Sequence, residues 1–172
     1  MNDFARQLEA LIPRLRRYAR ALTRDVSRAD DVVQSCLARA LAKQHLWQRR
    51  PGSDLRAWLF TILHNQYVNE VRSSVRDGIN VAVEEMAPML TVQSHAIAAL
   101  QLRDLEAAIA RLPHEQRQVI LLVVLEGMAY KQVAAVLQVP VGTVRSRLSR
   151  ARVQLRLEVE GKTAEIGHPR AA

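Results

Sequence analysis

Apolar residues at helical spacing lie on both sides of a tight turn between residues 130 and 152. Val133, Ala134 and Leu137 recur at intervals of three and four, which places them on one face of a short helix. Pro140 interrupts the pattern at the point where a second helix would begin. Two short helices around a tight turn predict a helix-turn-helix.

The second helix of this motif carries an apolar face of its own, made of Val141, Val144, Leu148 and Ala151. With these residues inward, the middle of the outer face holds Gly142, Ser146 and Ser149, and its flanks hold Thr143, Arg145, Arg147, Arg150 and Arg152. Such a face suits a DNA major groove, because arginines reach phosphates while short side chains let the helix approach base edges. A solvated helix face without a ligand is the alternative. The absence of any acidic residue between Lys131 and Leu157 argues against it, since solvated faces normally mix charges.

Helical periodicity also covers the N-terminal part of the chain. A first helix is predicted from about Phe4 to Leu22. We expect Ser27 to cap a second helix, with Asp30 and Asp31 in its positively polarised first turn. Cys36 falls on the apolar face of this second helix, so buried packing is its expected role.

A further helix begins at Leu55 behind a cap at Ser53 or Asp54. Its apolar side consists of Leu55, Leu59, Ile62, Leu63, Tyr67 and Val71, and an adjoining stripe consists of Trp58, Asn65, Asn69 and Arg72. Beside a loop with Trp47, Arg49 and Arg50, this stripe suits single-stranded DNA, because aromatic rings stack on bases, amides bind base edges and arginines neutralise phosphates. Core packing of Trp58 is the alternative, since tryptophan is readily buried.

Residues 73–95 separate the two helical parts, because they contain Gly78, Pro88 and scattered acids without a helical period. We therefore predict an all-α fold of two small helical domains joined by a flexible linker, the second domain ending in the helix-turn-helix. The predicted parts are a first domain at 1–75, a linker at 76–96, a second domain at 97–158 and a disordered tail at 159–172.

The charge balance points to a polyanionic partner. Lys and Arg number 25 against 17 Asp and Glu, which gives a formal net charge of +8 and a pI of about 10.7. The longest apolar run, 119–125, is far shorter than the roughly 20 residues of a membrane-spanning helix. The N-terminus also lacks an apolar signal segment. We therefore expect a cytoplasmic protein without membrane insertion.

The sequence shows no residue pattern that is typical of a catalytic site or a metal site. The histidines His45, His64, His95, His114 and His168 are scattered, and no two of them have ligand spacing on one helix. No glycine loop for phosphate is present, and adjacent acids such as Asp30 and Asp31 point apart on a helix. We predict neither an enzyme nor a site for a metal or cofactor.

Four segments, in order along nearly the whole chain, resemble bacterial RNA polymerase sigma factors of the extracytoplasmic-function group. They are Ala29–Gln34, Leu55–Asn65, Leu112–Arg117 and Gly142–Arg152. The resemblance implies a factor that directs core RNA polymerase to promoters for transcription initiation, with only a promoter-melting domain and a helix-turn-helix domain. It also implies a role in stress responses and an anti-sigma factor that covers both DNA-binding surfaces. A stand-alone helix-turn-helix regulator, which needs no polymerase-docking surface, is the alternative.

The resemblance assigns roles to individual positions. Docking on the clamp helices of the polymerase would use Asp31, Val33 and Gln34. Capture of the opened −10 strand, with a flipped base, would use Trp47, Arg49, Arg50, Asn65, Asn69 and Arg72. Contact with the −35 duplex would use Thr143, Arg145, Ser146, Arg147 and Arg150. The chain departs from many relatives at Ser35, where they have Glu, and at Gln138, a turn position often filled by Gly because its φ is positive.

Overall fold

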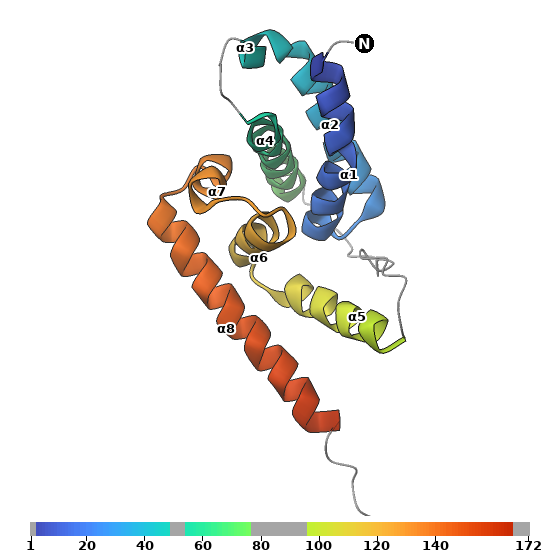
Figure 1. Cartoon of the computed structure of the whole chain (residues 1–172), viewed down its shortest axis with the longest axis vertical. Helices are drawn as coiled ribbons and strands as arrows, with labels where there is room; N and C mark the ends of the chain where they lie inside the picture. Colours follow the sequence, from blue (N-terminus) through green and yellow to red (C-terminus); the bar gives the residue numbers. More distant parts are fainter. Residues whose placement is uncertain (1–2, 49–53, 77–95, 167–172) are drawn as a thin grey trace, which may run out of the picture.

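The structure is a computed structural model that describes residues 3–48, 54–76 and 96–166. The N-terminal half contains α1 (Asp3–Thr23), α2 (Val26–Ala42), α3 (Gln44–Gln48) and α4 (Leu55–Arg76). The C-terminal half contains α5 (Ala96–Arg111), α6 (His114–Ile120), the π-helical turn η1 (Leu121–Leu125), α7 (Tyr130–Leu137) and α8 (Val141–Ile166) (Figure 1). Every regular element in these described ranges is helical, which confirms the predicted all-α class.

The N-terminal half is held together by packing of α2 against α1 and α4. Leu15, Tyr18, Leu59 and Phe60 are completely buried between these helices. The rings of Tyr18 and Phe60 meet edge to face with centroids 5.2 Å apart, a favourable arrangement for aromatic pairs. Burial of each large apolar side chain contributes about 1.5 to 3 kcal/mol, so this helix packing is the main source of local stability.

The cap of α2 differs from the prediction. The helix begins two residues earlier than expected, and its N-cap is Asp25, whose Oδ1 accepts from the backbone N–H of Arg28 at 2.9 Å. Ser27 is exposed inside the helix, so its predicted capping role is wrong. Asp30 and Asp31 lie beyond the first turn, in which they had been expected, and Asp30 pairs with Arg16 at 3.7 Å. Serine and aspartate are comparably good caps, so spacing alone did not choose between them. At α4, Asp54 caps as expected by accepting from the N–H of Arg56 at 2.9 Å.

The helix-turn-helix forms as predicted. Gln138 adopts the left-handed conformation at the turn, with φ of 55°, and the N–H of Val139 returns to the carbonyl of Ala134 at 3.1 Å. Val144 and Leu148 of α8 are buried beneath α7, as their spacing requires. Helix α8 continues to Ile166. Residues 159–166, which were expected to belong to a disordered tail, are therefore helical. Residues 167–172 and most of the predicted linker lie outside the described ranges.

The two halves pack against each other. Helix α4 lies against α7 (Figure 1), and η1 contacts α1. One continuous cluster of buried side chains draws members from both halves. No local sequence pattern indicates this contact, because the residues that meet are far apart along the chain.

A charged cluster lies at the centre of the contact between the halves. Glu126, which follows η1, has a fully buried side chain whose carboxylate accepts from Arg14 Nε and Arg17 Nη2, each at 2.9 Å. Its backbone carbonyl accepts from Arg14 at 3.0 Å and from Arg56 of α4 at 3.1 Å. Because a buried carboxylate is stable only when it is paired and hydrogen-bonded, these arginines make the burial of Glu126 possible.

Two further polar contacts cross between the halves. The Tyr67 hydroxyl is 2.9 Å from His114 Nε2, with the two rings stacked at 5.3 Å. Gln132 Nε2 of α7 donates to Asp54 Oδ2 at 2.8 Å. With the Glu126 cluster, these contacts add hydrogen bonds of defined geometry to the apolar core of the interface.

Because His64 of α4 is buried, we expect the free energy of unfolding to depend on pH. Burial, with a smaller effect of His114, lowers the pKa of His64 from 6.5 to about 4. Between these two values the unfolded chain binds a proton that the folded chain does not, so stability must fall as the pH falls. We expect the free energy of unfolding to decrease by up to about 3 kcal/mol between pH 6.5 and pH 4 from this residue alone.

Urea unfolding at several pH values measures this effect, and His64→Gln should remove that part of the pH dependence. Exposed His45, changed to Gln, is the matched control and should leave the wild-type profile intact. An identical pH profile for wild type and His64→Gln would contradict the assignment.

Candidate nucleic-acid interface

Helix α8 presents a cationic face to solvent. Its exposed residues include Gly142, Arg145, Ser146, Ser149, Arg150 and Arg152, while Thr143 is partly buried. Pro140 precedes the helix, and its carbonyl accepts from the N–H groups of Thr143 and Val144 at 3.0 and 3.2 Å. The small polar centre and cationic flanks expected from the sequence are therefore present on one surface.

Arg147 does not share this exposure. Only 18% of its side chain is accessible, and its Nη2 lies 2.8 Å from Glu115 Oε2 of α6. The prediction that Arg147 stands outward without an acidic partner is therefore wrong. The sequence window around the helix-turn-helix contains no acid, but α6 supplies one from outside it.

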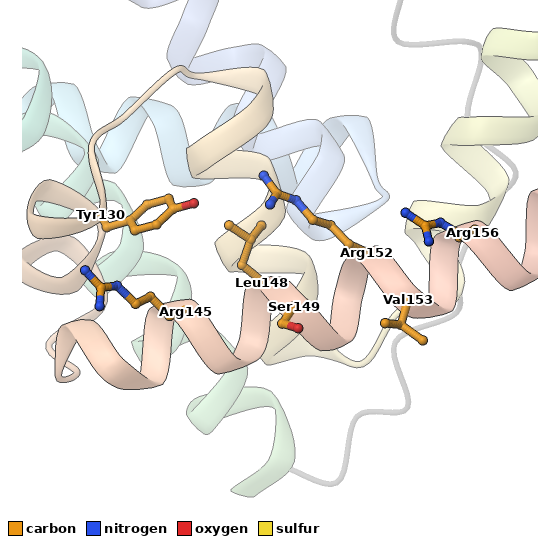
Figure 2. Close-up of a pocket in the computed structure, with 7 residues that line it drawn as sticks. All are labelled: Tyr130, Arg145, Leu148, Ser149, Arg152, Val153 and Arg156. Carbon is orange, nitrogen blue, oxygen red and sulfur yellow. The ribbon is translucent and has the colours of Figure 1, made fainter.

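A hollow of about 270 Å³ lies between α8 and the start of α7 (Figure 2). It is lined by Tyr130, Arg145, Leu148, Ser149, Arg152, Val153 and Arg156. Arg145, Arg152 and Arg156 follow at intervals of seven and four, so they share one side of the helix. Within the described part of the chain, none of these three arginines forms an ion pair. Cations without acidic partners around a concave surface are suited to phosphate groups.

A second hollow, also of about 270 Å³, lies in the N-terminal half between α2, α3 and α4. It is lined by Arg39, Lys43, Leu46, Trp58, Thr61, Ile62, Asn65, Gln66 and Asn69. The structure thus brings together an aromatic ring, several amides and two cations. Arg39 and Lys43 were missed by the sequence reasoning, and the only available signal was their position four residues apart near the end of α2.

The other residues expected around this hollow are placed differently. Trp47 does not line it, because its ring packs against Phe4 with centroids 5.5 Å apart. Arg72 is exposed on α4 but also lies outside the lining. Arg49 and Arg50 lie outside the described residues. Trp58 satisfies both interpretations, because it packs against Phe4 at 6.4 Å and also lines the hollow.

The residues expected to dock on the polymerase divide into two kinds. Asp31 and Gln34 are exposed on α2. Val33 is only 2% exposed and belongs to the core, so its predicted role as a docking contact is wrong. Its position beside Val32 and Cys36 on the apolar side of the helix explains the burial.

Cys36 is completely buried, and its Sγ donates to the carbonyl of Leu59 at 3.5 Å. Burial raises the pKa of this thiol to about 12. The reactive thiolate is therefore strongly disfavoured, which supports a packing role.

No group of three or more His, Cys, Asp and Glu side chains in the described ranges has the arrangement of a metal site. None of the described helices combines the length and apolar character needed to cross a membrane.

Comparisons with known proteins find related families for both halves of the chain. The family described as the Sigma2 domain of PhyR matches residues 8–64, and Sigma-70 region 4 matches residues 102–155. The chain is 40% identical over 146 residues to the ECF RNA polymerase sigma factor EcfG of Rhodopseudomonas palustris, covering 85% of this chain and 79% of that protein. It is 36% identical over 153 residues to SigL of Mycobacterium tuberculosis, covering 84% of this chain and 81% of SigL.

A solved structure extends the similarity to both halves. The sigma factor RpoE in complex with the anti-sigma factor NepR from Bartonella quintana matches with a TM-score of 0.80 and 34% identity, covering 93% of this chain and 98% of RpoE. The chain belongs to the ECF RNA polymerase sigma factors, which confirms the family suggested by its sequence. Members of this family are transcription initiation factors rather than enzymes.

Proposed function

We propose that this sigma factor acts in the cytoplasm, where it directs core RNA polymerase to specific promoters. Helices α7 and α8 bind the −35 duplex, and the hollow between α2 and α4 captures the opened −10 strand. The observation that carries the proposal is the presence in one chain of a helix suited to duplex DNA and a hollow suited to unpaired bases. A stand-alone regulator would require only the first.

Recognition of the −35 duplex falls to the exposed part of α8. Arg145 and Arg150 neutralise phosphates, while Thr143 and Ser146 approach base edges. Arg147 joins this set only after leaving Glu115, since one guanidinium in a 2.8 Å ion pair has fewer donors for DNA.

Capture of the −10 strand depends on α4. Asn65 and Asn69 hydrogen-bond base edges, and Trp58 offers a face for stacking. Arg39 and Lys43, across the hollow on α2, neutralise the backbone of the same strand.

Polymerase docking uses the exposed side of α2. Asp31 and Gln34 make the contacts, and Val33 supports them from the core. An anti-sigma factor is a further proposed partner, because the similar RpoE was solved in complex with one.

In vitro transcription from fragmented genomic DNA tests the proposed function. Purified core polymerase, with and without this protein, is followed by mapping of transcript starts. Protein-dependent starts that share two spaced upstream elements are the expected result. Failure to produce new starts, together with failure to co-purify with core polymerase, would instead favour the stand-alone regulator.

Substitution of arginines in α8 distinguishes an arginine that contacts phosphate from one that is already neutralised by an acidic side chain. Arg150→Ala should weaken binding of the holoenzyme to its promoter duplex and reduce the slope of log affinity against log salt by about 0.9, as loss of one phosphate contact requires. Arg147→Ala should change this slope much less, because Glu115 already neutralises Arg147. Arg6→Ala, an exposed change on α1, is the control. Equal slope changes for Arg147→Ala and Arg150→Ala would show that Arg147 leaves Glu115 for phosphate.

Substitution of Asn65 tests the strand-capture site. Asn65→Ala should leave core polymerase binding unchanged but reduce the fraction of opened promoter by roughly tenfold, since one lost base contact is worth about 1 to 3 kcal/mol. Permanganate reactivity of unpaired thymines measures opening. Gln7→Ala removes an exposed amide elsewhere and serves as control. If Asn65→Ala opened the promoter as well as the wild type does, Asn65 would have no role in strand capture.

A further inference from the structure

We propose that the cluster of Glu126, Arg14 and Arg17 is a latch that holds this sigma factor closed and must open before both promoter elements are bound. This inference rests on the proposed function, because it concerns access to the two DNA-binding surfaces. It is carried by a separate observation, namely the burial of a carboxylate whose charged partners lie in the other half of the chain.

The latch joins the halves through their charges. Glu126 belongs to the C-terminal half, whereas Arg14 and Arg17 belong to α1 of the N-terminal half. The carboxylate is fully buried, while the arginine side chains are 38% and 35% exposed. Separation of the halves would therefore remove both partners from Glu126 and admit water to it.

In the closed arrangement the two DNA-binding surfaces are closer together than the two promoter elements are along the duplex. Asn65 lies eleven residues beyond Asp54, about 17 Å along α4. Asp54 bonds directly to Gln132, which is two residues from Tyr130 in the hollow beside α8. This path between the two DNA-binding surfaces consists of about 17 Å of helix α4, one side-chain hydrogen bond and two residues of α7. Elements named −35 and −10 lie about 25 base pairs apart, roughly 85 Å of duplex at 3.4 Å per base pair.

Ion pairing makes the latch reversible. A buried ion pair gains Coulomb energy but loses hydration, so its net contribution is small when opening returns both charges to water. Loss of one partner in the closed state is different, because it leaves an uncompensated buried charge. The equilibrium between closed and open states should therefore respond strongly to changes in the arginines.

The similarity to RpoE supports the view that contacts within the chain are enough to hold its two halves together in the closed state. The match covers both halves at once, and RpoE was solved with NepR bound. The present chain reaches a comparable arrangement with contacts made by its own residues. We infer that a partner that prefers the closed state would shift a population that already exists.

Single-molecule energy transfer on the full chain tests the latch. Dyes are attached at Ala10→Cys on α1 and Ala135→Cys on α7, two exposed positions that are not among the individual residues proposed to contact DNA or polymerase. Buried Cys36 is replaced by Ala. The wild type should show mainly the high-transfer, closed population. Arg14→Gln with Arg17→Gln should raise the ratio of open to closed molecules at least about tenfold, because Glu126 then lacks its cations.

The matched control is Arg16→Gln on the same helix, since Arg16 is 55% exposed and pairs with Asp30 of its own half at 3.7 Å. This control should stay closed. Adding Glu126→Gln to the double arginine variant removes the unpaired charge and should restore much of the closed population. Circular dichroism should show the same helix content in all variants.

Several results would overturn the latch. The latch is rejected if the wild type is mainly open, or if the double arginine variant stays closed. It is also rejected if the Arg16→Gln control opens as much as the double variant, or if adding Glu126→Gln does not restore the closed population. Loss of helix content together with opening would show unfolding in place of latch opening. The readout needs neither polymerase nor promoter, so it is independent of the proposed function. Normal transcription by a chain without a closed population would reject the latch alone, whereas a latched chain that never supports transcription would reject the proposed function.

Discussion

The arrangement of this sigma factor depends on the neutralisation of one buried carboxylate. Glu126 ends the π-helical turn at a point where the C-terminal half meets α1, and its side chain has no access to water. Ionised carboxylates tolerate such surroundings only beside cations, which here come from Arg14 and Arg17. The carbonyl of the same residue also binds Arg56, so α1 and α4 are both fixed against it. Apolar contact between the halves adds stability, whereas this cluster defines which surfaces meet.

Arginine serves three purposes in this chain, and the nearest acid decides which. Where Glu126 is buried, arginines join the two halves. Arg147 of α8 pairs with Glu115 of α6 at 2.8 Å, and Arg111 of α5 pairs with Glu158 of α8 at 2.7 Å, so these arginines tie α8 to α6 and α5. Along the remaining face of α8 the arginines have no such neighbours in the described ranges, so their charge is available to a polyanion. The high net charge therefore describes a specific surface, although composition alone could not locate it.

Short-range periodicity predicted much of this structure, because helix faces repeat within a few residues. The helix-turn-helix and the placement of Trp58, Asn65 and Asn69 along one side of α4 follow from such spacing, whereas the left-handed turn at Gln138 was expected from the resemblance to sigma factors. The errors have a different origin. Arg147 and Glu115 are separated along the chain by 32 residues, and Arg14 and Glu126 by 112, so no local pattern relates them. The choice of Asp25 over Ser27 and the burial of Val33 were within reach of local reasoning, but they depended on where the helix began and on its inward direction.

The position of Trp58 shows that core packing and DNA recognition need not be competing roles. Its ring contacts Phe4, which also contacts Trp47, so three aromatic side chains fix one another at the end of α4. A stacking surface is useful only when its orientation is set before the ligand arrives, because ordering a loose side chain costs binding energy. Packing of Trp58 against Phe4 supplies that orientation, and the same side chain lines the hollow with Asn65 and Asn69. The core of the N-terminal half therefore determines the geometry of its proposed strand-binding site.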